Sequence, residues 1–339
     1  MKHKNLAVFI PHLGCPHRCS FCDQQCISGS VHAPSPAEVA ALCRDALPRM
    51  GDPAHSQIAF FGGSFTALPR DYMCRLLEAV QPFLRAGLAA GIRISTRPDY
   101  MDGETAALLA SYGVTAVELG AQSLSDPVLE MNERGHTAQD VYRAAACVRA
   151  QGMELGLQMM TGLYGSTPEA DLDTGRGCIA MQPDTVRIYP TVVLPGTGLA
   201  ARYAAGVYPM MPFSDMIDLC ARLLEGLYAA GIRVIRCGLH AQDGVSGSRI
   251  AGYYHPAFRE LCESRMLLRR MQAQIGTVEK GHTYMFRVHP GALSRGIGHK
   301  GCNRAWFAQQ GAGLGLIQDP ACGLHACIRD TGKETLACT

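Results

Sequence analysis

Short apolar runs alternate with longer amphipathic or alanine-rich stretches along most of the chain. The short runs are typical of buried strands and the longer stretches of helices. Strands are predicted at residues 6–10, 57–61, 92–95, 116–119, 155–159, 185–193 and 233–237. Helices are predicted at residues 36–49, 72–86, 103–111, 138–151, 168–181 and 213–230. Repeated strand and helix, joined by right-handed crossovers, predict an α/β fold with parallel strands, a partial (β/α)6-type barrel.

The alternation stops near residue 240. A Gly-rich segment at 243–252 is followed by a predicted helix at 256–275 and then by a stretch rich in Gly, His and Arg. A chain of 339 residues has room for a large α/β domain and a smaller extension. We therefore expect a core barrel at residues 1–240 and a C-terminal extension at 241–339 that is a candidate for binding substrate or RNA.

Composition narrows the classes of protein to consider. Hydrophobic residues make up 47% of the chain, charged residues 18%, and the net charge is +2, as in a compact enzyme. The first apolar run is too short for a signal peptide, and no run approaches the roughly 20 apolar residues of a membrane-spanning helix. We expect a cytoplasmic protein without a membrane partner, whose 15 cysteines are free, buried or metal-bound.

Three cysteines follow the first predicted strand in a C-x3-C-x2-C array, at Cys15, Cys19 and Cys22. Three thiolates can ligate three irons of a 4Fe-4S cluster, whereas an ordinary cluster of this type uses four cysteines. A three-cysteine set leaves one iron open, and an open metal position can bind a substrate or cofactor.

Two other uses of these thiols remain open at this point. Zinc could take the same cysteines together with His12 or His17, because C-x2-C is a common zinc spacing. Alternatively, Cys26 could complete an inert electron-transfer cluster.

Polar residues and glycines at the ends of the next predicted strands are candidates for binding a cofactor. Gly62 and Gly63 would permit close approach of the backbone to a ligand. Arg97 could bind a carboxylate through two hydrogen bonds. Glu118 and Gln122 could reach a ribose or substrate hydroxyl. The alternative is an internal network in which Arg97 pairs with Asp99 or Glu118.

The cysteine array, with Phe21 just before its last member, resembles the signature of radical S-adenosylmethionine enzymes. The resemblance implies that the open iron chelates S-adenosylmethionine, and that an electron from a donor such as a flavodoxin or ferredoxin then cleaves it to a 5′-deoxyadenosyl radical. Gly62, Gly63 and Ser64 resemble the glycine-rich methionine-binding motif, with Ser64 where an acidic residue often stands. That departure predicts contact through the backbone rather than through the Ser64 side chain.

Further motifs resemble the radical domain of the Elongator catalytic subunit, a tRNA-modifying enzyme. They lie, in order, at residues 95–100, 117–123, 132–137, 160–166 and 188–193, and the likeness covers roughly residues 5–240. Two departures limit it. The Elongator subunit spaces its cysteines more widely, and we expect neither its basic N-terminal region nor its acetyltransferase domain here. What the resemblance implies is therefore the radical-generating core.

The main hypothesis is thus an enzyme that reductively cleaves S-adenosylmethionine and acts on an unidentified substrate, with RNA as a candidate. One alternative is a radical enzyme like oxygen-independent coproporphyrinogen oxidase, acting on a small molecule. A non-enzymatic alternative is a zinc or iron-sulfur scaffold with an RNA-binding tail. RNA binding is suggested by segment 281–318, which lacks Asp and Glu and contains Arg287, Arg295, Lys300, Arg304 and Trp306. The other interpretation of this segment is a solvated loop.

Overall fold

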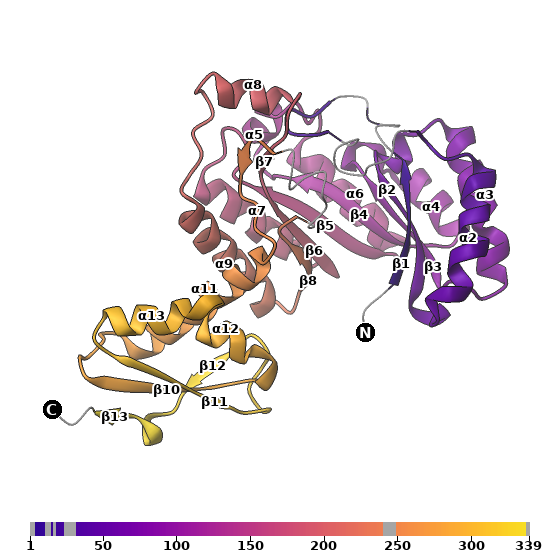
Figure 1. Cartoon of the computed structure of the whole chain (residues 1–339). Coiled ribbons are helices and arrows are strands. Elements are labelled where there is room, and N and C mark those ends of the chain that lie inside the picture. Colours follow the sequence, from indigo (N-terminus) through magenta and orange to yellow (C-terminus); the bar gives the residue numbers. More distant parts are fainter. Residues whose placement is uncertain (1–3, 11–14, 16–17, 24–31, 240–248, 337–339) are drawn as a thin grey trace. The chain divides into compact units, whose positions relative to one another are not determined.

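The computed structural model describes residues 4–10, 15, 18–23, 32–239 and 249–336 (Figure 1). Contacts between residues divide the chain into two compact units. The first unit comprises Met1–Met210, Ile232–Arg236 and His240–Tyr254, and the second comprises Met211–Gly231, Cys237–Leu239 and His255–Thr339. The chain enters the second unit three times, so this division is finer than the single boundary expected near residue 240.

The first unit is built on a seven-stranded sheet whose strands follow one another in sequence order. The strands are β1 (Lys4–Ile10), β2 (Ser56–Gly62), β3 (Gly91–Thr96), β4 (Val114–Gln122), β5 (Glu154–Thr161), β6 (Thr185–Pro190) and β8 (Arg233–Cys237). Each pair from β1 to β6 is parallel. The sheet curls into a half-barrel, which confirms the predicted α/β class and partial barrel (Figure 1).

Helices connect consecutive strands and lie along the sheet (Figure 1). They are α2 (Pro36–Met50), α3 (Arg70–Arg85), α4 (Gly103–Ser111), α6 (Ala138–Ala150) and α7 (Pro168–Ala180). Local sequence explains where they begin. For example, Ser35 caps α2 in a capping box, in which its side chain accepts from the Glu38 N–H and the Glu38 carboxylate accepts from the Ser35 N–H. Because β-strands joined by such helices run in parallel, their carboxyl ends share one edge.

The second unit places helices against a small sheet. Its main elements are α9 (Phe213–Ala229), α11 (Phe258–Ile275), β10 (His282–Val288), α12 (Leu293–Ile297), α13 (Cys302–Gln309), β11 (Gly313–Gln318), β12 (Cys327–Arg329) and β13 (Thr335–Leu336). Strand β10 is central: it pairs in parallel with β11 and antiparallel with β12 and β13. Tyr284, Phe286 and Val288 alternate along β10 and are buried in the core of the unit. The sequence analysis predicted α11 but none of these strands.

Some further elements differ from the prediction. The expected strand at 185–193 ends at Pro190, and Val192–Val193 forms a separate strand, β7, which pairs with β9 (Ala251–Gly252). The separation follows from Thr191, whose N–H and hydroxyl both donate to the Thr161 carbonyl. Two short helices, α5 (Asp126–Met131) and α8 (Gly198–Ala204), were not predicted.

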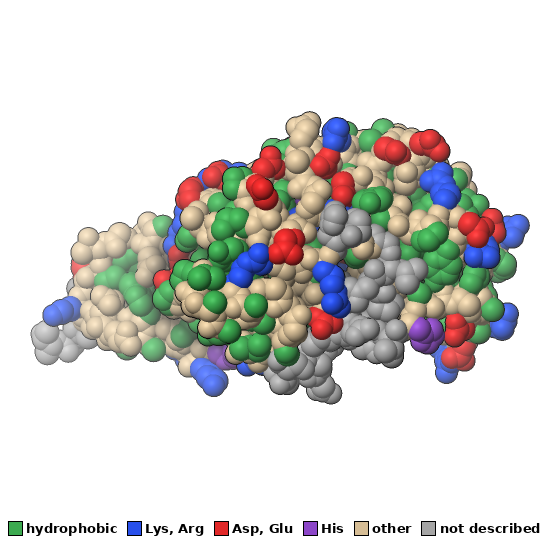
Figure 2. All heavy atoms as spheres, turned by 90° about the horizontal axis from the view of Figure 1, so that it is seen from above, with side chains coloured by type: hydrophobic (Ala, Val, Ile, Leu, Met, Phe, Trp, Pro, Cys, Tyr) green, Lys and Arg blue, Asp and Glu red, His purple; other side chains and the backbone are tan. Residues whose placement is uncertain are grey.

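The surface is mixed in charge. On the face seen in Figure 2, acidic and basic side chains are interspersed, in keeping with the net charge of +2. Helices long and apolar enough to span a membrane do not occur in the described part of the chain.

Burial along the helices predicts which leucines stabilise the first unit. Leu76 in α3 is 0% exposed and Leu42 in α2 is 39% exposed. Replacing Leu76 by Ala leaves a cavity and should lower the free energy of unfolding by about 2–5 kcal/mol. Leu42→Ala should change it by about 0.5 kcal/mol or less. Urea unfolding of both variants checks this, and equal effects would contradict the described packing.

Candidate functional site

The three cysteines of the array lie on the loop that follows β1, here called the cysteine loop. Cys15, Cys19 and Cys22 are all partly exposed, and the Cys22 N–H donates to the Cys19 carbonyl at 3.0 Å, which closes a turn. Burial raises the pKa of the Cys15 thiol, and the neighbouring Cys19 raises it further, whereas the Ser64 backbone N–H, Arg134 and Arg97 lower it. Cys15 therefore lies close to Cys19 and to the end of β2.

The glycine-rich end of β2 meets the end of β1. Gly62 has φ +112°, and a Cβ on it would lie 2.8 Å from the Ile10 carbonyl oxygen, so only glycine fits without strain. The Gly63 N–H donates to the same oxygen at 2.7 Å. Gly62 thus permits the close approach of strand β1. The sequence had predicted that a ligand would approach the backbone at this glycine. The effect is to bring residue 64 beside Cys15.

The Ser64 side chain makes contacts inside the first unit, whereas the Ser64 backbone lies next to the cysteine loop. Its hydroxyl bonds to the Thr96 hydroxyl at 2.9 Å and accepts from the Arg97 N–H at 3.2 Å. It is 1% exposed. The backbone N–H, by contrast, acts on the Cys15 sulfur. Side-chain contact with a ligand is therefore not available from Ser64 in this arrangement.

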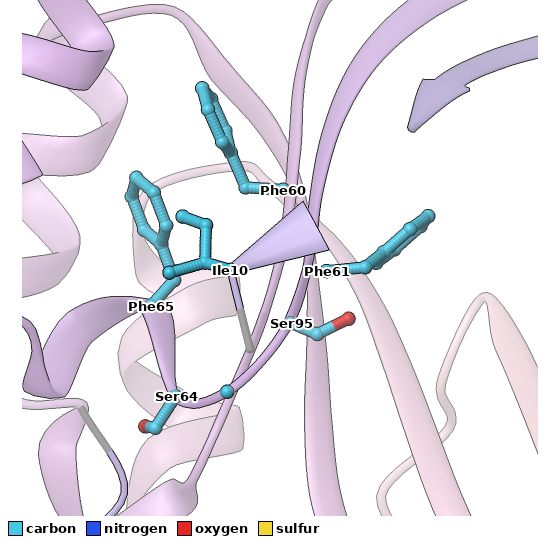
Figure 3. A pocket seen from close by; sticks show the side chains of 7 residues that line it. Ile10, Phe60, Phe61, Ser64, Phe65 and Ser95 are labelled. Carbon is cyan, nitrogen blue, oxygen red and sulfur yellow. The ribbon is translucent and has the colours of Figure 1, made fainter. Parts of the chain in front are cut away.

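A small recess lies beside these strand ends (Figure 3). It has a volume of about 160 Å³ and is lined by Ile10, Phe60, Phe61, Gly63, Ser64, Phe65 and Ser95. The rings of Phe60 and Phe65 stack with centroids 4.8 Å apart. That volume includes open solvent, and the recess has no room for an enclosed water molecule. It is therefore a shallow hollow rather than a ligand-binding pocket.

Arg97 is held by Asp99, as in the alternative that the sequence left open. Its Nε and Nη2 donate to the two carboxylate oxygens of Asp99 at 3.0 and 2.8 Å, and the residue is 4% exposed. This bidentate pair fixes the guanidinium in a position from which its charge still lowers the pKa of Cys15.

Glu118 lies inside the half-barrel in a network of charged side chains. Its Oε1 accepts from Arg93 at 3.3 Å and from Arg187 at 2.9 Å. Arg93 also donates to Gln57 at 2.8 Å and to Glu154 at 2.9 Å. Buried charges need such partners, because an unpaired one would be costly. The structure thus places Glu118 in an internal network.

Gln122, at the end of β4, has a different environment. It is 5% exposed and has φ +62°, an uncommon conformation for a non-glycine residue. Its Oε1 is buried and has no hydrogen-bond partner in the described residues. A buried acceptor without a partner is unusual in a native protein, and it is what a ligand with a donor group would satisfy.

The sequence analysis did not assign two residues that hold the cysteine loop. Asn132 is fully buried and makes two contacts with Ser20: its carbonyl accepts from the Ser20 N–H at 3.2 Å, and its Oδ1 accepts from the Ser20 hydroxyl at 3.1 Å. Arg134 donates to the Cys19 sulfur at 3.2 Å and to the Gly120 carbonyl at 2.7 Å. Both residues lie in the motif at 132–137. That motif had indicated only a resemblance to a family, not contacts with the cysteine loop.

The three thiols on one loop are a donor set of the kind that an iron-sulfur cluster uses. Zinc would need its thiolates about 2.3 Å from a single point. A cubane instead binds each cysteine to a different iron. His12, His17 and Cys26, which the alternatives require, lie outside the described residues.

The basic segment 281–318 is largely neutralised by carboxylates from other parts of the second unit. Arg295 donates to Glu263 at 2.8 Å and its side chain is only 13% exposed. Arg287 lies 3.3 Å from Asp330 and 3.7 Å from Asp319. The segment itself lacks Asp and Glu, but carboxylates outside it balance part of its positive charge. Its net positive charge is therefore smaller than its sequence alone indicated.

Two of the four basic side chains have no carboxylate partner among the described residues, whereas Arg287 is exposed but paired. Lys300 and Arg304 are exposed and form no ion pair with the described residues. Trp306 instead packs against the core of the second unit and is only partly exposed. Any RNA contact made by this segment would thus depend on Lys300 and Arg304.

Comparisons with known proteins agree with the cysteine array. The family model of the radical SAM superfamily matches residues 9–174, and that of the radical SAM C-terminal domain matches residues 183–267. A tRNA uridine(34) acetyltransferase of Dehalococcoides mccartyi is 28% identical, over 68% of this chain and 58% of that protein. Elongator complex protein 3 of Bos taurus is 33% identical, over 60% of this chain and 40% of that protein. The chain thus matches about half the length of these relatives.

Solved structures share the fold. The archaeal Methanocaldococcus infernus Elp3 with an N-terminal deletion has a TM-score of 0.61 at 20% identity, covering 81% of this chain and 64% of that one. Coproporphyrinogen III oxidase from Escherichia coli has a TM-score of 0.50 at 20% identity, covering 68% of this chain and 54% of that one. At these identities the likeness concerns the fold.

His136, beside Arg134, predicts a pH dependence of stability. It is 5% exposed, its Nε2 lies 3.2 Å from the Ala121 carbonyl oxygen, and burial, then Arg134, lowers its pKa to about 4. The unfolded chain has a histidine pKa of about 6.5, so it binds this proton first as the pH falls. Stability present above pH 6.5 is therefore lost between about pH 6.5 and pH 4, by roughly 3 kcal/mol.

The measurement is the free energy of unfolding against pH for the wild type and for His136→Gln. The variant should lack this part of the acid destabilisation. Parallel curves for the two proteins would show that His136 is not held neutral by its surroundings.

Proposed function

The chain belongs to the radical S-adenosylmethionine superfamily, and on this premise we propose that Cys15, Cys19 and Cys22 bind three irons of a 4Fe-4S cluster used to cleave S-adenosylmethionine reductively. The observation that supports this most is the position of the cysteine loop. Arg134 donates to the Cys19 sulfur at 3.2 Å, and its charge partly opposes the effect of burial, which raises the pKa of the Cys15 thiol. Hydrogen bonds of this kind stabilise thiolates, which are the form that binds iron.

The chain's own residues bind and orient the cofactors in this proposal. When bound, the cluster supplies the electron that splits S-adenosylmethionine into methionine and a 5′-deoxyadenosyl radical. The backbone at Gly62, Gly63 and Ser64 forms the wall next to Cys15, and Gln122 offers its unsatisfied Oε1 to a donor on S-adenosylmethionine. The aromatic rings of the recess exclude water from this side.

Arg97 and Glu118 have an indirect role at the proposed cofactor site, since other side chains already engage their charged groups. Asp99 engages the Arg97 guanidinium, and Arg93 and Arg187 engage Glu118. Their charges contribute to the electrostatic surroundings of the cofactor, and their pairs keep the strand ends in place. Direct contact with S-adenosylmethionine would require these pairs to rearrange.

The reaction needs an external electron and surroundings that protect thiols. A small electron-transfer protein such as a flavodoxin or ferredoxin is the proposed donor. The proposed location is the cytoplasm, because thiols stay reduced there.

We propose RNA as the substrate class, on the support of the relatives. One of them is a tRNA uridine(34) acetyltransferase, and another is Elongator complex protein 3. This chain matches only 58% and 40% of their lengths, so the transferable part is the radical chemistry. The exposed Lys300 and Arg304 are the proposed phosphate contacts in the C-terminal segment.

The cluster proposal predicts the metal content of cysteine variants. Anaerobically reconstituted wild type should hold about four iron and four sulfide per chain. Cys15→Ala, Cys19→Ala and Cys22→Ala should each lose the cluster, because each loss exposes an iron. Cys43→Ala is a matched control: Cys43 is 0% exposed in α2, away from the loop, and this variant should keep the cluster.

Cofactor cleavage is measured on the same samples. Reduced wild type and Cys43→Ala should form 5′-deoxyadenosine from S-adenosylmethionine, and the three other variants should not. A cluster that survives loss of Cys22 but not of Cys26, or a fully loaded wild type that forms no 5′-deoxyadenosine, would be at odds with the proposal.

RNA binding has a separate test, based on salt dependence. If Lys300 and Arg304 each contact one phosphate of a single strand, their joint replacement by Ala should flatten the plot of log affinity against log salt by about 1.4. Arg44→Ala with Arg149→Ala, two exposed arginines of the first unit, is the control and should keep the wild-type slope. Binding is measured with a tRNA transcript. Identical slopes for wild type and the Lys300/Arg304 variant would remove this segment from the RNA hypothesis.

A further inference from the structure

We propose that Arg134 is a positioning residue that raises the reduction potential of the cluster through the Cys19 thiolate. The inference rests on the proposed function, since it needs a cluster bound by Cys15, Cys19 and Cys22. The inference goes beyond the proposed function because it assigns a role in electron uptake to a residue outside the cysteine array.

The contacts of Arg134 direct its charge at the cysteine loop. One guanidinium nitrogen, Nη1, donates to the Cys19 sulfur at 3.2 Å, and the other, Nη2, donates to the Gly120 carbonyl at 2.7 Å. The residue is 6% exposed. Held at two points and away from water, the guanidinium cannot simply turn out to solvent.

The charge of Arg134 is not balanced by a carboxylate. Arg97 nearby pairs with Asp99, but no ion pair of the described residues includes Arg134. Its Nε is also buried without a hydrogen-bond partner in the described part of the chain. A buried cation without a counter-ion is strongly destabilising. Thiolates bound to a cluster would supply the missing negative charge at this position.

The backbone around Arg134 explains why the side chain is fixed. The residues on either side, Glu133 and Gly135, have φ of +57° and +71°, and the Arg134 N–H donates to the Leu129 carbonyl at 3.0 Å. This closes a tight turn after α5. A Cβ on Gly120 would lie 3.0 Å from Gln122 Nε2 and at ordinary contact distance, 3.4 Å, from Arg134 Nη2, so glycine here mainly leaves room for the Gln122 amide. The geometry is thus built into the turn and the strand end.

The cluster's three thiolates are not equivalent in this arrangement. Cys19 accepts a hydrogen bond from the charged Arg134, whereas the same charge acts on Cys15 only through space. Reduction adds one electron from the donor protein to the cluster and increases its negative charge, with no bond formed or broken. Hydrogen bonds and positive charge next to the sulfurs stabilise that state and raise the potential.

The test is a redox titration of the full-length, anaerobically reconstituted protein, followed by electron paramagnetic resonance. Iron content is measured first for every sample. Arg134→Met should shift the potential negatively, with the reduced-to-oxidised ratio at a fixed potential falling about tenfold, which is about 59 mV for one electron. Arg134→Gln should shift it in the same direction, and Arg134→Lys by less, because lysine keeps the charge but not the two-point contact.

Arg143→Met is the matched control. It removes an exposed arginine of α6 that pairs with Asp140 and leaves the Arg134 charge in place, so its potential should equal that of the wild type. If Arg134→Met loses its iron, Arg134→Gln decides. Iron-loaded Arg134→Gln with the wild-type potential would overturn the inference, whereas a wild type that binds no cluster would overturn the proposed function as well.

Discussion

The site depends on the anchoring of one short loop by residues that are distant in the sequence. Phe21 of this loop packs against the buried Val193, Leu199 and Tyr208. Asn132 holds Ser20, Arg134 holds Cys19, and the Ser64 backbone lies beside Cys15. These contacts require the ends of β1, β2 and β4 to lie together. The parallel sheet, with its strands in sequence order, provides this arrangement.

Polar groups in the interior of the half-barrel are paired with one another, whereas some of those at the carboxyl ends of its strands are not. In the interior, Glu118 is balanced by Arg93 and Arg187. At the edge, among the described residues, the Gln122 Oε1 has no hydrogen-bond partner and Arg134 has no carboxylate partner. A balanced network stabilises the sheet, whereas unsatisfied groups near the thiols leave donors and acceptors for cofactors. This contrast supports a binding role for the edge and a mainly structural role for the interior.

Periodicity predicted the partial barrel well, whereas the role of the cysteine array stays a prediction. Continuous apolar runs mark parallel strands buried on both faces, and the three cysteines lie close in sequence. The pairing of side chains could not be predicted in the same way. Whether Arg97 meets Asp99 or a ligand depends on rotamers, and Arg295 meets Glu263 from another helix. Strand β10 was missed because its alternating Tyr284 and Phe286 lie in a segment dominated by Gly, His and Arg.

In the proposed site, one iron of the cluster has no cysteine ligand and is free to bind S-adenosylmethionine. The electron paramagnetic resonance spectrum of the reduced, cluster-loaded protein before and after addition of S-adenosylmethionine tests this. The spectrum should change, because the cofactor's amino and carboxylate groups would bind that iron. An unchanged spectrum, with equilibrium dialysis showing that S-adenosylmethionine is bound, would contradict it.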